Sequence, residues 1–414
     1  MSSAALREVE THLALILSRV RPLEAITAPA RASLGRTLRE PLRARVDIPV
    51  FDNSAMDGFA VRYADVADAA PDRPVRLRVV ADLPAGTALD PDLAHGEAAR
   101  IMTGAPVPTS ADAIVPFEDT AGGLPDSLGE IVVERAPKAH GAHVRRRGED
   151  ARAGAELLPA GFVLGPLQLA AAAAAGIADV VVSPSPRVAV VSTGSELVQT
   201  GAPLRRGQIP ESNGELLAAL VTEASAEVVL RRTVPDDGDE PLRAVAEASA
   251  LGADVTIFTG GISAGAYEPV KRTLAGSMEF TAVRMQPGKP QGFGATGDGM
   301  LLFGLPGNPV SAAVSFEAFV RPALLALQGR TSLDRPLIRL AAKVGWRTPP
   351  GRRQYLPAVI DRSDPGRWTV APATAGGSGS HLAGGLARAE AYAVIAADVE
   401  AVAPDDLVDV MLIA

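Results

Sequence analysis

Apolar residues near the amino terminus recur at the spacing of an amphipathic helix. Between residues 5 and 20 they fall every three or four positions, at Leu6, Val9, Leu13, Ile16, Leu17 and Val20, which places them on one helical face. Acidic residues in "MSSAALREVETHLALIL" stand where a signal peptide would carry a basic start and an apolar core. The pattern predicts an amphipathic helix and no export.

Two further patterns precede residue 180. Residues 74–135 consist of short alternating runs, such as "VRLRVV" and "EIVVERA", separated by Pro, Gly and Asp, and this predicts a small β domain. The segment "GPLQLAAAAAAGI" opens with Pro166 and closes at Gly176, an order typical of a helix. We expect this helix to link two parts of the fold.

From residue 186 apolar strands alternate with helical segments. "RVAVVSTGSEL", "AEVVLRRTVPDD" and "ADVTIFTGGISAG" each run from a strand into a loop of small or acidic residues, which predicts a doubly wound parallel sheet. Ligands bind such sheets at the carboxyl ends of the strands. A helix near 310–328 and short β-like runs beyond it predict a small C-terminal β domain.

Composition narrows the function classes. The chain has 414 residues, is 47% hydrophobic and carries a net charge of −8, so it has room for about three domains, and affinity for nucleic acid or acidic membrane is disfavoured. The absence of cysteine excludes disulfides and thiolate chemistry and fits a cytoplasmic protein. The apolar run "LQLAAAAAAGIADVVV" is broken by Gly176 and Asp179, and we expect no membrane-spanning segment.

Three loops of small residues follow the predicted strands. "TGGISAG" offers backbone N–H groups and the Thr259 and Ser263 hydroxyls to an anion, although an ordinary glycine-rich turn would look the same. "STGSE" and "LPGNPVS" lie at the same predicted sheet edge, and together the loops favour a phosphate or pterin pocket. There is no G-x-G-x-x-G and no Walker loop, which argues against dinucleotide-dependent hydride transfer and P-loop hydrolysis.

Charged residues follow the same strands. Carboxylates able to hold Mg²⁺ with substrate phosphates, or simply to cap helices, occur at Glu196, Asp236, Asp237 and Glu268. Of the 40 basic residues, only four are lysines, among them Lys289 in the rigid loop "QPGKPQG" and Lys271. A compact ammonium at a rigid loop can bind an oxyanion, whereas a solvated surface role is the alternative and is favoured for Lys271.

Other polar clusters have simpler interpretations. "DNSAMDG" at 52–58 has the composition of a turn, "RRRGED" at 145–150 that of a solvated charged loop, and His140 with His143 that of a surface pair. Neither H-E-x-x-H nor G-x-S-x-G is present, so zinc and serine hydrolases are not indicated.

Eight ordered motifs over nearly the whole chain carry a specific resemblance. "FDNSAMDGFAV", "RIMTGAPVP", "RRRGED", "STGSEL", "TGGISAG", "QPGKPQGFG", "GLPGNPVSA" and "GSH" resemble the molybdopterin molybdenumtransferase family, the MoeA and gephyrin E-domain group. The resemblance implies an L-shaped homodimer of four-domain chains. The implied domains are a discontinuous helical linker and dimer domain (1–25, 42–52 and 146–180), a β-rich domain (26–41 with 53–145), a molybdopterin-binding-like α/β domain (181–330) and a C-terminal β domain (331–414).

The resemblance also implies a reaction. Adenylylated molybdopterin and molybdate would react with Mg²⁺ present, molybdenum would enter the dithiolene and AMP would be released, in molybdenum cofactor biosynthesis. By position, the implied catalytic residues are Asp57, Thr103, Asp150, Glu196, Asp236 and Lys289. The implied metal ligands are Glu196, Asp236 and Glu268. The implied substrate-binding residues are Thr193, Gly194, Ser195, Gly260, Gly261, Ser263, Gly288, Pro306, Gly307, Asn308, Ser311, Arg352 and Ser380.

Three positions depart from the family pattern. Glu268 stands where many members have aspartate, Gln286 replaces the first lysine of a Lys-Pro-Gly-Lys motif, and Pro357 replaces a second arginine near Arg352. The missing charge at 286 predicts a lower molybdate affinity than in other members.

The resemblance further implies that the β-rich domain of one subunit faces the pterin pocket of the other, so that Asp57 and Thr103 act across the dimer. The implied substrate donor is a molybdopterin adenylyltransferase. Two alternatives remain open: a non-catalytic pterin-binding scaffold of the same fold, and a nucleotide-pyrophosphate hydrolase. The intact acidic set favours the transferase over the scaffold, and the flanking domains argue against the hydrolase.

Overall fold

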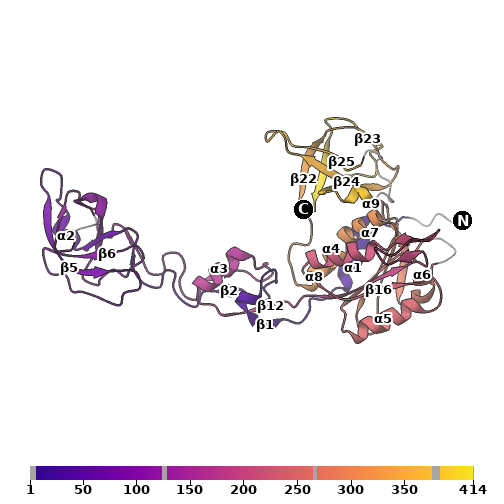
Figure 1. The fold of residues 1–414 in the computed structure, drawn as a ribbon, viewed down its shortest axis with the longest axis horizontal. Helices are drawn as coiled ribbons and strands as arrows, with labels where there is room; N and C mark the ends of the chain where they lie inside the picture. The colour runs from indigo at the N-terminus through magenta and orange to yellow at the C-terminus, as the bar shows by residue number, and fades with distance from the viewer. Residues whose placement is uncertain (1–5, 124–127, 264–267, 375–382, 414) are drawn as a thin grey trace.

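The computed structural model describes residues 6–123, 128–263, 268–374 and 383–413. Figure 1 shows an elongated chain with four units: an α/β unit, a C-terminal barrel beside it, a small middle unit and a distal β unit at the far end of the long axis. The chain leaves the α/β unit after its first helix, forms the middle and distal units, and returns to the α/β unit at about residue 186.

The α/β unit is built on a six-stranded sheet in the order β16-β13-β17-β21-β20-β18. The first four strands are parallel, as expected of a doubly wound sheet, but β20 runs antiparallel to both of its neighbours, β21 and β18, so the sheet is mixed. The strands are β13 (Arg187–Thr193), β16 (Glu227–Val234), β17 (Val255–Thr259), β18 (Met278–Ala282), β20 (Pro290–Ala295) and β21 (Leu301–Leu305). A short parallel pair, β14 (Leu197–Val198) and β15 (Ile209–Pro210), lies beside it.

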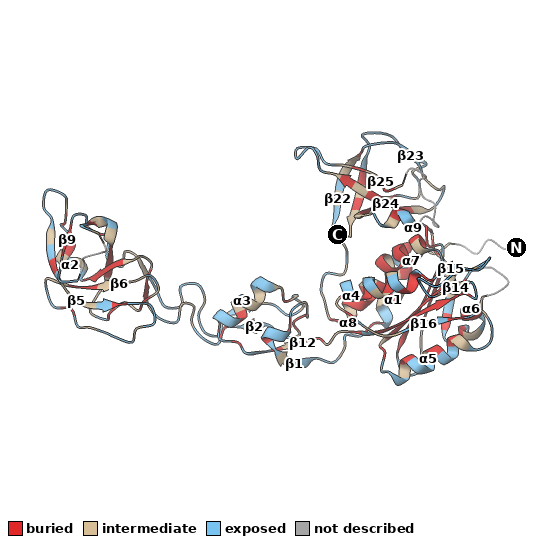
Figure 2. Ribbon diagram, in the orientation of Figure 1, coloured by how far each residue is buried: buried red, intermediate tan, exposed pale blue. Residues whose placement is uncertain are grey.

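Helices cover both faces of this sheet because the central strands are apolar on both sides. Val188 and Val190 of β13 belong to one core cluster, and Ala189 and Val191 to the other. The first face packs against α1 (Val9–Arg19), α4 (Asn213–Glu223), α7 (Pro309–Ser315), η3 (Phe316–Val320) and α8 (Arg321–Leu327). The second packs against α5 (Glu240–Ala250) and α6 (Pro269–Leu274). Figure 2 shows the buried residues concentrated in the sheet and its inward helix faces.

One continuous helix runs through α7, η3 and α8, and its middle turn is a π-helix. By length and hydropathy this helix, Pro309–Leu327, could span a membrane, but 83% of it is buried inside the fold. Its apolar character is therefore explained by packing against the sheet.

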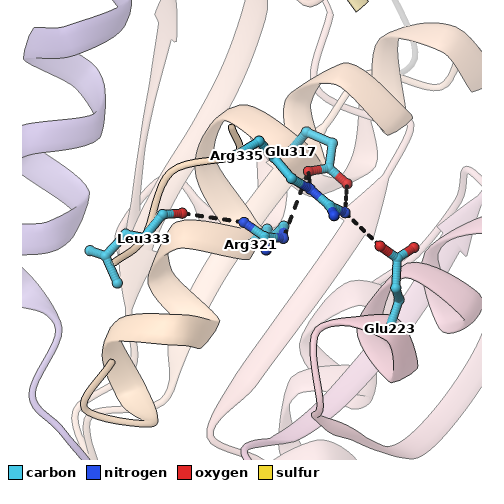
Figure 3. Close-up of polar contacts among 5 residues, drawn as sticks. All are labelled: Glu223, Glu317, Arg321, Leu333 and Arg335. Atoms are coloured by element: carbon cyan, nitrogen blue, oxygen red, sulfur yellow. Dashed lines mark hydrogen bonds and ion pairs between the residues drawn. The ribbon is translucent and has the colours of Figure 1, made fainter. Parts of the chain in front are cut away.

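The π turn carries a buried ionic cluster, drawn in Figure 3. Arg335, in the linker that leads to the barrel, donates to both oxygens of Glu317 at 2.9 and 3.0 Å and to Glu223 at 2.6 Å. Only 2% of the Glu317 side chain is exposed. Burial lowers the pKa of Arg335, but its hydrogen bonds to Glu317 and Glu223 outweigh this and raise the pKa above its ordinary value.

The C-terminal barrel closes on itself through the sequence of pairings β24-β25-β22-β28-β26-β24. Its strands are β22 (Leu337–Ala342), β24 (Arg353–Asp361), β25 (Thr369–Pro372), β26 (Ala391–Ile395) and β28 (Leu407–Leu412), with the minor pair β23 (Trp346–Arg347) and β27 (Ala401–Val402) and the short helix α9 (Ala383–Leu386). Strand β19 (Met285–Gln286) of the α/β unit pairs with β24. This pairing ties the barrel to the loop that follows Gln286.

Paired segments far apart in sequence form the middle unit. Strand β1 (Ile26–Pro29) pairs with β12 (Asp179–Val182), and β2 (Leu42–Arg43) pairs with β11 (Glu156–Leu158). The pair β3 (Asn53–Ser54) and β10 (Val144–Arg145) belongs to the distal unit, because Ser54 bonds to Gly104 and Ala105 and Val144 packs on a distal core cluster. Helix α3 (Pro166–Ala174) and the turn η1 (Ala30–Ala32) complete the middle unit. The pairing of β1 with β12 groups residues 26–29 with the middle unit, whereas the predicted boundaries put 26–41 with the β-rich domain. Helix α1, assigned above to the discontinuous domain, packs on the α/β unit.

The distal β unit contains a mixed sheet in the order β7-β4-β6-β5-β9-β8. Its elements are β4 (Gly58–Val61), α2 (Tyr63–Val66), β5 (Val75–Leu83), β6 (Glu97–Ile101), β7 (Ala113–Pro116), η2 (Phe117–Asp119), β8 (Thr120–Ala121) and β9 (Glu130–Val133). Apolar clusters pack on both sides of the sheet, which gives the unit its own core. It corresponds to the small β domain predicted from the alternating runs.

Candidate active site at the carboxyl edge of the central sheet

A cavity of about 770 Å³ opens where the parallel strands of the α/β unit end. Its walls come from the loops after β13, β17 and β21, from the start of α4, and from the loop between β19 and β20. Of the residues predicted from the sequence, those that line it are Thr193, Gly194, Glu196, Asp236, Gly260, Gly261, Ser263, Glu268, Gly288, Lys289, Pro306, Gly307, Asn308 and Ser311. The small-residue loops therefore converge as the parallel topology requires.

Glycine is required where two of these loops meet. Gly260 has a φ of +90°, and a Cβ atom there would lie 2.7 Å from the backbone oxygen of Thr193. The Gly260 N–H donates to Leu305 O at 3.0 Å, which connects the β17 loop to the end of β21. A larger residue at position 260 would push the loop after β17 away from the end of β13.

A buried amide holds two of the loops together. The Nδ2 atom of Asn213, at the start of α4, donates to Thr259 Oγ1 at 2.9 Å and to Gly307 O at 2.7 Å. Thr259 in turn donates its hydroxyl to Pro306 O at 3.1 Å. Both Nδ2 hydrogens are thus used, which fixes the orientation of the amide, and the buried Oδ1 atom has no hydrogen-bond partner among the described residues.

Four carboxylates and one lysine are the charged residues of the described lining. Asp236 accepts from the Ser195 N–H at 3.1 Å, and Ser195 Oγ accepts from the Asp236 N–H at 3.0 Å. Glu268 Oε2 accepts from the Ser263 N–H at 2.6 Å. Glu196 and Glu211 complete the acidic set. The capping interpretation is not supported for Asp236, because the N-cap residue of α5 is Asp239.

The basic side of the cavity lies on the β19–β20 loop. Lys289 is exposed and lines the cavity. Beneath the loop, the buried Gln291 amide donates to Gly288 O and to Ser315 Oγ, both at 2.7 Å, which holds the loop against helix α7. Arg352 of the barrel donates to Gln286 Oε1 at 2.8 Å, so it meets the cavity through a lining residue.

Asp57 and Thr103 form a separate polar contact in the distal β unit. The Thr103 N–H and hydroxyl donate to Asp57 Oδ1 at 2.6 and 2.7 Å, and these bonds hold the pKa of Asp57 below its ordinary value. Asp150 is exposed in the turn after β10, and its N–H donates to Ile48 O. Figure 1 shows the distal unit well away from the α/β unit. Within one chain these three residues do not reach the cavity.

Comparison with known proteins identifies the family. Family models match residues 7–176 (MoeA N-terminal region, domain I and II), 189–326 (probable molybdopterin binding domain) and 339–413 (MoeA C-terminal region, domain IV). Molybdopterin molybdenumtransferase 2 of Mycobacterium tuberculosis is 44% identical over 368 residues, which cover 86% of this chain and 88% of the relative. The chain belongs to the molybdopterin molybdenumtransferase family.

Other relatives agree with this assignment. The molybdopterin molybdenumtransferase of a Nostoc species is 40% identical over 303 residues, which cover 72% of this chain and 68% of that protein. The crystal structure of the molybdopterin biosynthesis MoeA protein from Pyrococcus horikoshii shares 32% identity with a TM-score of 0.79, covering 99% of both chains. Membership confirms the predicted family, fold class and enzyme assignment, and it supports a role in molybdenum cofactor biosynthesis.

Several of the residues that the sequence pointed to do not line the cavity of this molybdopterin molybdenumtransferase family member. Ser195 contacts it through Asp236, and Arg352 through Gln286. Ser380 lies outside the described residues. Lys271 sits on α6 and Asp237 after β16, and neither lines the cavity. Pro357 is a strand residue of β24 paired with Tyr392, so the departure at this position lies in the barrel wall.

Glu211 and Asn213 were not predicted as site residues. The segment "ESNGELLAALVTEAS", which contains both residues, predicts one of the helices that alternate with the strands, and no more. The useful signal is that a helix following a strand of a parallel sheet begins at the ligand-binding edge. Both side chains line the cavity of this molybdopterin molybdenumtransferase family member.

Proposed function

We propose that this protein inserts molybdenum into adenylylated molybdopterin, using molybdate as the metal source and releasing AMP. The observation that carries the proposal is the single cavity in which glycine-rich loops, four carboxylates and Lys289 meet at the carboxyl edge of the sheet. Glycine loops can bind phosphate through backbone N–H groups, and the cavity is of the size that encloses a small-molecule ligand. The family names of the relatives supply the substrate class.

Each group of residues has a role that suits its chemistry. The loops at Thr193–Gly194 and Gly260–Gly261 would bind the pterin and phosphate groups, because their small side chains leave the backbone open. Lys289 would bind molybdate or phosphate oxygens as a positive charge. Arg352 would orient the same loop through Gln286. The sulfur ligands of molybdenum would come from the substrate, so the absence of cysteine is no obstacle.

The acidic residues fit a Mg²⁺ site completed by substrate. No group of three His, Asp or Glu side chains in the described part of the chain is placed to hold a metal alone. Mg²⁺ is commonly bound by one or two carboxylates together with substrate phosphates, and Glu196, Asp236 and Glu268 line the cavity where such phosphates would lie. Bound there, Mg²⁺ would neutralise charge on the phosphoanhydride. The proposed cofactor site therefore forms only with nucleotide substrate present.

We propose further that the enzyme is a cytoplasmic homodimer whose active sites are shared. The Asp57–Thr103 contact is preformed and exposed, yet it lies far from the cavity of its own chain. A second chain would bring a copy of this contact to the cavity. A molybdopterin adenylyltransferase would supply the substrate.

The test is to incubate the protein with adenylylated molybdopterin, molybdate and Mg²⁺, and to follow both AMP release and reconstitution of a molybdenum-free apoenzyme. We expect both products, and we expect Glu196→Gln and Asp236→Asn variants to lose both. The exposed Glu215→Gln on α4, outside the cavity, is the matched control. AMP without reconstitution would instead indicate a pyrophosphate hydrolase, and neither product would indicate a scaffold.

A further inference from the structure

One wall of the cavity presents hydrogen-bond acceptors that lack donors. This wall is the segment Glu211–Asn213, which leads from β15 into α4. Only 6% of Glu211 and 8% of Asn213 is exposed, and both line the cavity. A ligand that displaces water from this wall must supply a donor to any accessible oxygen there, because an acceptor left unpaired costs free energy.

The carboxylate of Glu211 is held rigidly through one oxygen. Its Oε1 atom accepts from the Ser192 hydroxyl at 2.9 Å and from the Gly214 N–H at 2.7 Å. Oε2 accepts no hydrogen bond from the described residues. The protein does not enclose this oxygen, so a ligand in the cavity can reach it. A Cβ atom at position 214 would lie 2.6 Å from Oε2, so Gly214 leaves room for this oxygen.

Asn213 is the second polar residue of this wall. Its Nδ2 hydrogens are committed to Thr259 and Gly307, so the amide cannot turn over to offer a donor. Its Oδ1 atom remains without a partner in the described structure. Asn213 Oδ1 is enclosed by the protein, so the acceptor that this wall offers to a ligand is Oε2 of Glu211, and the Asn213 side chain has no uncommitted donor.

The chemistry of the wall restricts what can bind there. A carboxylate at a buried site repels phosphate and molybdate and attracts N–H or O–H groups. In the substrate of the proposed function, the anionic groups must then lie toward Gly260–Gly261 and Lys289. The donor groups of that substrate lie on the adenosine and on the pterin ring, and the pterin ring carries a 2-amino group beside a ring N–H, a paired donor edge that suits a carboxylate.

We propose that Glu211 recognises the pterin ring by accepting a hydrogen bond from its N–H edge, with Asn213 on the same wall. This inference rests on the proposed function, since it names how that substrate is oriented. It makes Glu211 a specificity-determining residue. A site built to accept hydrogen bonds discriminates strongly against an analogue that lacks the donor.

Glu211→Gln is the decisive variant because it preserves size. The Gly214 N–H requires an acceptor, so the glutamine oxygen stays on that side and its NH₂ group replaces Oε2. A donor then faces the N–H edge of the ligand. We expect metal-free molybdopterin to bind at least about tenfold more weakly, while AMP binding and the thermal midpoint change little. Glu215, on helix α4 just after this wall, is exposed and pairs with Arg231, and the Glu215→Gln variant should bind molybdopterin like the wild type.

The outcomes separate the two proposals. Wild-type protein that does not bind molybdopterin would overturn the proposed function. Wild-type protein that binds it, with a folded Glu211→Gln variant that binds equally well, would overturn only the role of Glu211. Weaker AMP binding by the variant would assign Glu211 to the nucleoside and overturn the pterin assignment.

A second measurement needs no variant. Pterin and lumazine differ in that lumazine carries an oxygen in place of the 2-amino group. We expect pterin to compete with molybdopterin for the wild-type cavity at least about tenfold more strongly than lumazine does. Equal competition would contradict recognition of the amino edge even if the Glu211→Gln variant failed to fold.

Discussion

Arg352 of the barrel donates a 2.8 Å hydrogen bond to Gln286 Oε1 on the loop that carries Lys289. The neighbouring strands β19 and β24 pair at this point, so the contact extends a main-chain connection between the two units. The sequence resemblance predicts a lysine at position 286 in other members of the family. On that prediction, this chain has a neutral acceptor for an arginine where the others have a second cation at the cavity.

Restoring that charge should strengthen the binding of molybdate. In Gln286→Lys a second ammonium would stand near Lys289, and we expect molybdate affinity to rise on the order of fivefold at low ionic strength. The gain should shrink as salt is added. Gln286→Leu removes the acceptor for Arg352 without adding charge, and it should show no gain. Isothermal titration measures all three proteins, and a lysine variant without tighter binding would contradict the idea.

A shared active site makes a quantitative prediction for mixed dimers. Asp57→Ala and Glu196→Ala should each be inactive, because each removes one part of every site. In a heterodimer one site combines both damaged parts and the other is intact. If subunits mix at random, half of the dimers are mixed, so we expect about a quarter of wild-type AMP release. Differently tagged subunits allow heterodimers to be isolated; isolated heterodimers without activity would place Asp57 outside the site.

Much of the α/β unit could be predicted because its signals are local. Strand β13 is apolar on both faces, and the small-residue loops follow strands that topology forces to end together. The pairing of β1 with β12 could not be predicted, because about 150 residues of chain separate Ile26 from Val182 and both segments are too short to show a period. The α1 helix was predicted, but amphipathicity does not identify the surface that it covers.

The candidate site residues also divide into those that depend on local sequence and those that depend on distant contacts. Glycine and acidic residues directly after strands were found to line the cavity, since their positions depend on the sheet alone. The role of Glu211 depends on its bonds to Ser192 and Gly214, and nothing in a linear pattern distinguishes it from an ordinary helix-start acid. Asp57 illustrates the opposite case. Its turn is visible in the sequence, whereas its relation to any cavity depends on a second chain.

The Glu317–Arg335 pair should be a major determinant of stability. Arg335→Met would leave the nearly enclosed Glu317 carboxylate without its bidentate partner, and loss of one member of a buried pair costs about 3–5 kcal/mol. The exposed pair Arg339–Asp409 on the barrel is the matched control, and Arg339→Met should cost less than about 1 kcal/mol. Denaturant unfolding measures both. Equal losses would show that Glu317 is satisfied in another way.

Burial of His12 should make stability fall in mildly acidic solution. His12 is almost fully buried against Phe319, and burial, aided by Arg7, lowers its pKa from 6.5 to about 4. The folded state therefore binds this proton less readily than the unfolded state, and stability present above pH 6.5 is lost as the pH falls toward 4. Between pH 7 and pH 5 the loss should be roughly 2 kcal/mol. His12→Leu keeps the apolar contact and removes the titration, so its unfolding free energy should change less over this interval; an unchanged pH dependence would assign the effect to other groups.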